Sequence, residues 1–373
     1  VPYSQSRIFA IKETRIYQLV KRHVTKVTFI LAALMTLLFQ PYVWSAAEFD
    51  GTTLESGLQH FGRADYASAA EKFRSAADLA AQSGDVKQQI LASNYLADTL
   101  RAQGRHGRSI DVLESVRPLA EAENDPQTIA TLYGRLAAAY TRVGEFDRAD
   151  ALLQQAIGLA RKTDDTSLLA SLLNDQGNLL VLNGKLGRAD TTFRASIAAA
   201  MRSGNLPVEV SARNNLVRSL LARDQHREVA DLLAANQERA GQLPDTADSA
   251  QSLITIGALL QQAQTGAQSP VLLRRQAFAI LQEGLSLATK FQDRRLESYA
   301  LGYIGRLYED EGRLKEAGGY TDRAVFLAQS IGANDSLYLW EWQSARLLRD
   351  SGDIDKALLA YRQSINSLQK IRI

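Results

Sequence analysis

Pairs of polar residues three or four positions apart recur along this sequence. The set comprises Asn94 and Asp98, Asn174 and Asn178, Asn214 and Arg218, Tyr303 and Arg306, and Arg346, which follows Trp342. Residues with this spacing lie on one face of a helix. An asparagine side chain carries a donor and an acceptor, so it can hold a peptide backbone without reading its sequence, and an arginine fork can hold a carboxylate. We interpret these residues as candidates for binding an extended peptide. The alternative, that they are ordinary polar surface residues, stays open.

Residue types that carry catalysis or bind metals are sparse. The histidines are His23, His60, His106 and His226, and no two of them have the spacing of metal ligands. The absence of cysteine excludes disulfides and thiolate sites, and no phosphate-binding or dinucleotide-binding motif occurs. We therefore expect no catalytic residue, no metal site and no cofactor.

The elements that must position the polar pairs repeat every forty residues. Gly104, Gly144 and Gly184 are forty apart, and Gly312 and Gly352 resume the same period near the C-terminus. Self-similarity at a fixed period of roughly 20 to 50 residues is typical of a solenoid, whose units bury their apolar faces against their neighbours. The low proline content agrees with an all-α chain.

Each repeat is predicted to contain two amphipathic helices. The third repeat has Leu136, Ala137, Tyr140, Gly144, Phe146, Ala149, Leu153 and Ala156. Apolar residues spaced by three and four predict helices on both sides of Gly144, which is suited to end the first one. Acidic or amide residues that can cap the first helix of a repeat keep the same period. They are Asp85, Asp125, Asp165, Asn205, Asp245 and, after an insertion, Asp293.

This pattern resembles the tetratricopeptide repeat (TPR), which has Leu-Gly-x-x-Tyr on helix A and Ala-x-x-x-Phe-x-x-Ala on helix B. The matching residues of the first and seventh repeats are Gly57, Tyr66, Ala69, Phe73 and Ala76, and Ile304, Gly305, Tyr308, Gly312, Ala317 and Ala324. The resemblance covers about residues 48–373. It implies an α-solenoid, a right-handed TPR superhelix of about eight helix-turn-helix repeats, with helix A lining a concave groove that binds a protein or peptide partner.

The sixth repeat carries eight extra residues between its two helices, near positions 264–271. Insertions in solenoids map to loops on one face, which in some arrays is a binding face. The alternative, a tolerated surface loop, stays open.

Forty-residue units also resemble the arrays that precede a CHAT domain, a caspase-like peptidase fold, in many bacterial proteins. No CHAT residues occur in this sequence. The chain reaches Ile373 directly after an amphipathic helix, whereas a terminal repeat normally has a polar outer face. We expect a partner or a further domain at this end.

Residues 1–47 have the layout of a secretory leader. Lys21, Arg22 and Lys26 precede an uncharged apolar run at 27–39, and small residues follow at 45–47. This arrangement predicts a signal peptide and therefore export, in a bacterial cell to the periplasm. The alternative is an inner-membrane anchor formed by residues 27–44, which would be the chain's one contact with a membrane.

The charge balance offers no case for a nucleic-acid partner. The net charge of +2 includes six Lys and Arg and one Glu within residues 1–47, so 37 basic and 40 acidic residues remain after them. A surface without an excess of positive charge lacks the electrostatic attraction that nucleic-acid binding requires.

Three functions fit these features. The first is a non-enzymatic, exported TPR scaffold that binds an extended segment of another protein in its groove. The second is the sensor half of a longer CHAT-type protease. The third is a structural subunit of a cell-envelope assembly that uses other faces of the solenoid.

Overall fold

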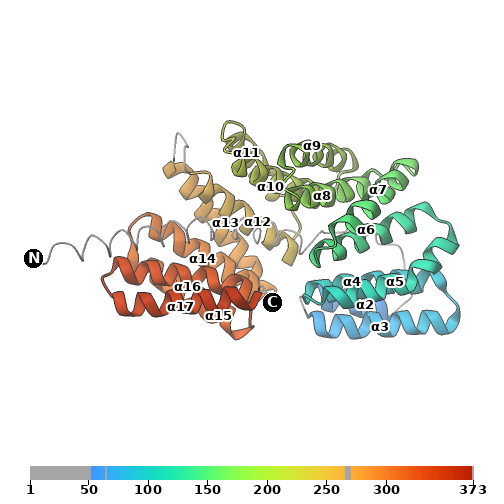
Figure 1. Ribbon diagram of the computed structural model, residues 1–373, viewed down its shortest axis with the longest axis horizontal. Helices are drawn as coiled ribbons and strands as arrows, with labels where there is room; N and C mark the ends of the chain where they lie inside the picture. Colours follow the sequence, from blue (N-terminus) through green and yellow to red (C-terminus); the bar gives the residue numbers. More distant parts are fainter. Residues whose placement is uncertain (1–51, 64, 265–269, 372–373) are drawn as a thin grey trace, which may run out of the picture.

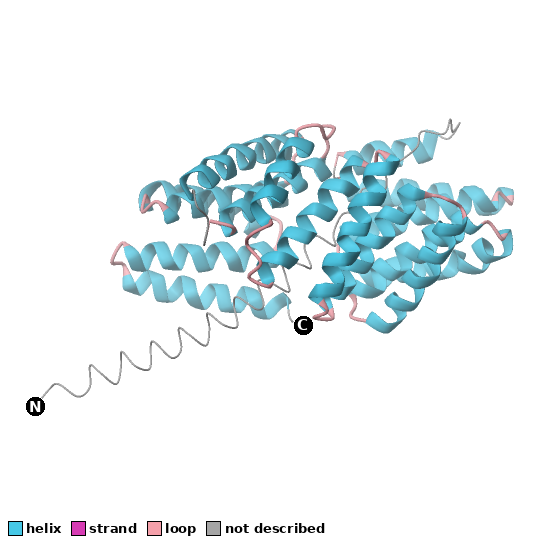
Figure 2. Ribbon diagram, turned by 90° about the horizontal axis from the view of Figure 1, so that it is seen from above, coloured by secondary structure: helices cyan, strands magenta, loops and turns pink. Residues whose placement is uncertain are grey.

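The computed structural model describes residues 52–63, 65–264 and 270–371, and the regular elements within these ranges are all α-helices (Figures 1 and 2). The predicted leader, residues 1–47 with its apolar run at 27–39, lies outside the described residues. Most of the predicted insertion at 264–271 lies outside them too. No helix in the described ranges combines the length and apolar character needed to cross a membrane.

The described residues form sixteen helices in eight successive pairs, which confirms the all-α solenoid of about eight repeats. The A helices are α2 (Thr52–Gly62), α4 (Val86–Ala102), α6 (Pro126–Arg142), α8 (Thr166–Leu182), α10 (Leu206–Ala222), α12 (Ala247–Gln262), α14 (Arg294–Asp310) and α16 (Asn334–Asp350). The B helices are α3 (Tyr66–Ser83), α5 (His106–Glu123), α7 (Phe146–Lys162), α9 (Leu186–Ser203), α11 (Val229–Ala240), α13 (Pro270–Lys290), α15 (Leu314–Ser330) and α17 (Ile354–Ile371).

The solenoid curves so that the A helices lie on the inside (Figure 1). Successive A helices from α4 to α16 contact one another directly, in addition to the B helices that pack between them. Elements on the inner side of a curved stack are the ones that approach most closely. The inner, concave surface is therefore built from α4, α6, α8, α10, α12, α14 and α16.

Helix starts follow the predicted caps with one exception. The side chains of Asp85, Asp125, Asp165, Asn205 and Asp293 accept backbone N–H groups of the helix that follows each of them. Asp245 was wrongly predicted as a cap. The hydroxyl of Thr246 caps α12 instead, by accepting the N–H of Ser249, while Asp245 pairs with Lys290 at 2.6 Å.

Glycine–phenylalanine contacts hold the two helices of a repeat close together. A methyl group at Gly177 of α8 would lie 2.3 Å from the ring of Phe193 on α9, and Gly57 stands in the same relation to Phe73. Phe73 and Phe193 are among the largest fully buried side chains. The glycine and phenylalanine positions of the TPR pattern thus depend on each other, because a glycine, which has no side chain, makes room for the phenylalanine ring.

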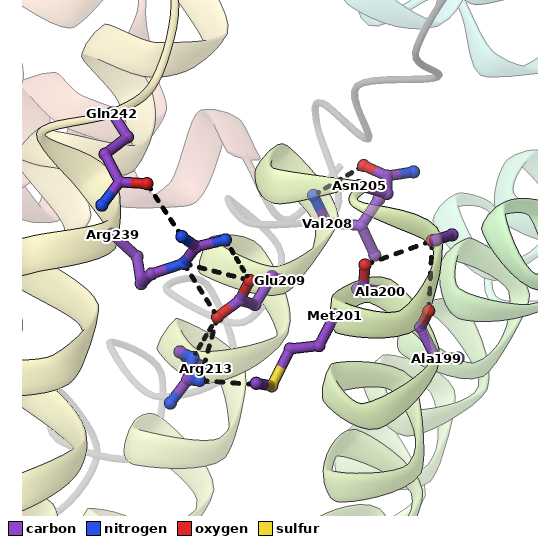
Figure 3. Close-up of polar contacts among 10 residues, drawn as sticks. Ala199, Ala200, Met201, Asn205, Val208, Glu209, Arg213, Arg239 and Gln242 are labelled. Carbon is purple, nitrogen blue, oxygen red and sulfur yellow. Dashed lines mark hydrogen bonds and ion pairs between the residues drawn. The ribbon is translucent and has the colours of Figure 1, made fainter.

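The fifth repeat departs from the others at its turn. Gly144 in the third repeat has φ 83°, a left-handed conformation, whereas Asp224 occupies the equivalent position with φ 55°. Helix α11 has only 12 residues and no side-chain cap. Its place against α10 is held by Glu209, which is 1% exposed and accepts from Arg213 and Arg239 at 2.9 Å each (Figure 3).

The sixth repeat keeps part of its insertion in regular structure. Helix α13 begins at Pro270 and has 21 residues, against 17 or 18 in most other B helices. The end of the predicted 264–271 loop is therefore helical. Its first turn presents Val271 and Leu272, which are exposed.

The two ends of the curve face each other (Figure 1). Burial raises the pKa of Tyr66 at the start of α3, and the charges of Asp293 and Asp248 raise it further. Burial lowers the pKa of Arg142 at the end of α6 to about 10, and Arg295 and Arg101 lower it further. Charged groups of repeats one to three therefore act electrostatically on those of repeats six to eight.

Candidate functional site

A row of polar side chains crosses the concave surface from α4 to α10. We call this set the polar row: Asn94, Asp98 and Arg101 of α4, Arg135 of α6, Asn174, Asp175 and Asn178 of α8, and Asn215 and Arg218 of α10. Positions 135, 175 and 215 are forty apart and thus occupy the same place in successive repeats. The row contains the predicted residues of repeats two and four and, of repeat five, Arg218 but not Asn214.

Members of the row bind one another across repeats. Arg135 donates through Nε to Oδ2 of Asp98 at 2.9 Å, and Asn215 donates through Nδ2 to Oδ1 of Asn174 at 3.0 Å. Arg218 donates through Nη1 to Oδ1 of Asn215 at 3.1 Å. The first of these contacts joins α4 to α6, the second joins α8 to α10, and the third lies within α10.

The predicted asparagines are more enclosed than the sequence suggested. A solvated position on the open groove face was expected for each, but Asn94 is 5% exposed, Asn174 0% and Asn178 6%. The expectation of exposure was wrong because neighbouring A helices pack directly against each other. A short amide between two such helices is largely covered by them.

Several predicted residues already have partners within the fold. Asp98 is ion-paired with Arg135 and Arg101, and Oδ1 of Asn214 accepts from Nδ2 of Asn236 at 2.8 Å. Arg346 binds both carboxylate oxygens of Glu309, each at 2.7 Å. These contacts stabilise neighbouring helices, which is a structural role for Asn214 and Arg346.

The predicted residues of the last repeats lie on α14 and α16. Tyr303 of α14 packs edge-on against Trp340 of α16, with ring centroids 5.4 Å apart, and Trp342 packs against Tyr361 of α17. Tyr303 also interacts electrostatically with Arg218 of the polar row. Arg306 is exposed, and Arg346 pairs with Glu309.

Buried polar atoms without a protein partner cluster in the row. They include Oδ1 of Asn94, Nδ2 of Asn174, Nδ2 of Asn178 and both carboxylate oxygens of Asp175. An unsatisfied buried donor or acceptor costs about 1–3 kcal/mol. Proteins usually satisfy such groups, so a concentration of them on one surface marks a place where another molecule can supply the partners.

Four members of the row were not predicted from the sequence, namely Arg101, Arg135, Asp175 and Asn215, and Asp175 is the one whose titration is most informative. Burial raises the pKa of its carboxyl group to about 7; Arg101 opposes this rise and Asp98 adds to it. The repeat spacing could have identified Asp175 from the sequence, because it lies forty residues after Arg135 and forty before Asn215. Strongly shifted pKa values gather at functional sites.

The histidines of the described chain have structural roles, in side-chain packing and beside a helix cap. Burial lowers the pKa of His106 to about 4, and the charges of Arg142 and Arg101 lower it further. His60 contacts Asp65 at 2.9 Å. Across residues 52–63, 65–264 and 270–371, no three His, Asp or Glu side chains gather in a way that could hold a metal ion.

The C-terminal helix, where a partner or further domain was predicted, exposes apolar side chains. Ile354, Leu358, Leu359 and Ile365 of α17 are each about half exposed or more. The predicted occupant of this surface stays a prediction.

These features define a solenoid of helix pairs with a polar concave surface. The tetratricopeptide-repeat family model matches residues 128–202. This match shows tetratricopeptide repeats in residues 128–202, and the solved structures below share the fold of the described chain. A comparison with curated protein sequences found no significant match.

Solved structures share the fold at low identity. The apo quorum sensor NprR from B. thuringiensis is 14% identical, with a TM-score of 0.61 over 94% of this chain and 95% of NprR. A Rap conjugation regulator of plasmid pLS20, solved with the Phr* peptide, is 14% identical, with a TM-score of 0.56 over 78% of this chain and 76% of that one. A STAND protein with a TPR sensor from Pyrococcus horikoshii is 15% identical, with a TM-score of 0.58 over 86% of this chain and 50% of that protein.

Proposed function

We propose that this chain is a non-enzymatic, exported scaffold that binds an extended segment of a protein or peptide along the polar row. The observation that carries the proposal is the group of unsatisfied buried amides on α4 and α8. The backbone of an extended peptide presents N–H and C=O groups at regular intervals. If the A helices that cover these atoms move apart to admit it, it can satisfy Oδ1 of Asn94 and Nδ2 of Asn174 and Asn178 whatever its side chains are.

The fold comparisons are consistent with this role. The structure of the Rap regulator contains a bound peptide, and NprR is a quorum sensor. Both share the solenoid architecture with this chain. This likeness supports a peptide ligand for the fold but does not identify the ligand.

Binding to a library of short random-sequence peptides tests the proposal. The double variant Asn174→Ala, Asn178→Ala removes two unsatisfied donors, and we expect it to lose about tenfold or more in affinity for every peptide that the wild type binds. The matched control is Gln154→Ala with Gln155→Ala, which truncates two exposed amides on α7 and should leave affinity unchanged. Equal binding by all three folded proteins would move the interaction away from the concave surface.

The rival functions make different predictions. If the chain is the sensor half of a CHAT-type protease, its gene should continue past Ile373 into a segment with His and Cys. The STAND protein provides a precedent for a TPR sensor joined to another domain. If the chain is a structural subunit of an envelope assembly, the double alanine variant should assemble normally, whereas substitutions on α17 should prevent assembly.

We also propose that residues 1–47 direct export. The intact mass of the protein from its own cells tests this, against a full-chain mass of 41.0 kDa. A mass of about 36 kDa indicates cleavage of the leader, and a mass near that of the full chain indicates a retained anchor.

A further inference from the structure

We propose that the ligand of the polar row carries a lysine or arginine side chain whose cation pairs with the carboxylate of Asp175. This inference rests on the proposed peptide binding and adds the charge of one side chain of the ligand. Neither the repeat pattern nor the fold comparisons indicate that charge.

The first observation is the isolation of the Asp175 carboxylate. The residue is 4% exposed, and neither of its oxygens has a hydrogen-bond partner within residues 52–63, 65–264 and 270–371. An ionised carboxylate in such a place is strongly disfavoured unless a cation or several donors meet it. Asp175 is therefore the group in the row with the most to gain from a positively charged partner.

The second observation is that the cations of the row are engaged. Arg135 and Arg101 both pair with Asp98, and Arg218 donates to Asn215. The arginines were expected to hold a carboxylate of the ligand. The structure favours the opposite polarity on α8, because Asp98 has two arginine partners whereas the carboxylate of Asp175 has no hydrogen-bond partner among the described residues.

The third observation is the chemistry of the groups on either side of Asp175. Asn174 precedes it and Asn178 lies three residues beyond it on α8, and each has an unsatisfied Nδ2. These two donors fit carbonyl oxygens of a ligand backbone, whereas the carboxylate of Asp175, which shares a helix face with Asn178, fits a donor that carries charge. A long, slender side chain such as that of lysine or arginine can reach a recessed carboxylate while the backbone stays with the amides.

The groups around Asp175 set the pH dependence of this contact. The charged groups that act on Asp175 are Arg101 and Asp98 of α4; the other charged members of the row are Arg135 of α6 and Arg218 of α10, and Asp175 is its one titratable member on α8. Burial raises the pKa of Asp175 to about 7, and a cation binds only the ionised form. Affinity for a basic peptide should therefore rise about tenfold between about pH 6 and about pH 8.

The test is a positional-scanning library of short peptides, in which each position in turn is fixed as Lys, Arg, Gln or Glu. It is applied to the wild type, to Asp175→Asn and to Asp111→Asn. Asp175→Asn keeps the shape of the side chain and removes a buried charge, so the variant should fold, which a thermal melt will check. Asp111 is exposed on α5, so its variant makes the same charge change away from the concave surface.

The expected result is a preference of about tenfold for Lys or Arg over Gln at one position in the wild type and in Asp111→Asn. In Asp175→Asn this preference should vanish, and so should the pH dependence, while Gln-bearing peptides still bind. Peptide binding without a basic preference, or with one that Asp175→Asn retains, overturns this inference and leaves the proposed function standing. Preference for Glu or for a free C-terminal carboxylate would assign recognition to an arginine such as Arg306 and would also overturn it. No peptide binding by the wild type removes both the proposed function and the inference.

Discussion

The Nδ2 group of Asn215 donates to Oδ1 of Asn174 at 3.0 Å, across two A helices and 41 residues of sequence. The contact fixes which way the amide of Asn174 points, because its oxygen is taken by α10. In the part of the chain that the structure describes, its nitrogen has no hydrogen-bond partner. One cross-repeat hydrogen bond thus orients a donor that the fold does not itself use.

Gly177→Ala should destabilise the protein by about 1–3 kcal/mol, because the added methyl group would meet the ring of Phe193 at 2.3 Å. The matched control is Gly158→Ala in the middle of α7, where a methyl group meets nothing within 4 Å. That variant should gain up to about 1 kcal/mol from helix propensity. Urea unfolding measures both, and a stabilised Gly177→Ala would show that α8 and α9 can move apart at no cost.

Glu209→Gln should destabilise the protein by about 2 kcal/mol, since the buried carboxylate holds Arg213 and Arg239. The comparison is Glu228→Gln, which breaks a pair with Arg194 whose side chains are about half exposed and should cost less than about 1 kcal/mol. If the two variants unfold at the same urea concentration, Glu209 does not anchor α11.

Stability should depend on pH through Asp175. Its pKa of about 7 in the folded protein lies above the ordinary 3.8, so between these values the folded chain holds a proton that the unfolded chain has released. Unfolding free energy should therefore fall as pH rises from about 4 to about 7, by up to about 1.4 kcal/mol per pH unit, and then level off. Asp175→Asn should flatten this slope relative to the wild type, and an unchanged slope would assign the effect to other groups.

Salt should let the two ends of the curve approach each other. The positive charge of Arg295 repels that of Arg142 at the opposite end, and added salt screens such interactions. The radius of gyration from X-ray scattering should fall with ionic strength, and Arg295→Glu, which turns this repulsion into an attraction, should lower it already at low salt. Arg313→Glu changes an exposed arginine that pairs with Glu316 in its own repeat and should leave the radius unchanged.

The sequence predicted the fold well because each repeat encodes the same local events. Gly144 and its equivalents end helix A, and Asp85 and four of its counterparts cap the next repeat, all within a few residues of the helix they control. Asp245 failed because Thr246, one residue later, offers a hydroxyl in the extended conformation of an N-cap.

The site was predicted only in part because its contacts join residues about forty apart. The asparagine pairs lie on the predicted helices, but the pairing of Asp98 with Arg135 depends on how far each repeat turns relative to the previous one. No local pattern gives that angle. Asp175 stood beside a predicted residue and was missed for the same reason, since its isolation results from the neighbours that pack over α8.

The short helix α11 has a consequence for how the molecule would respond to mechanical load. In a solenoid each repeat is held only by the next, and the fifth repeat relies on Glu209 where others rely on a full-length, tightly packed B helix. Force applied to the two ends should therefore disrupt the packing of the fifth repeat first. The four repeats before it and the three after it would then separate as intact blocks, with the polar row divided between α8 and α10.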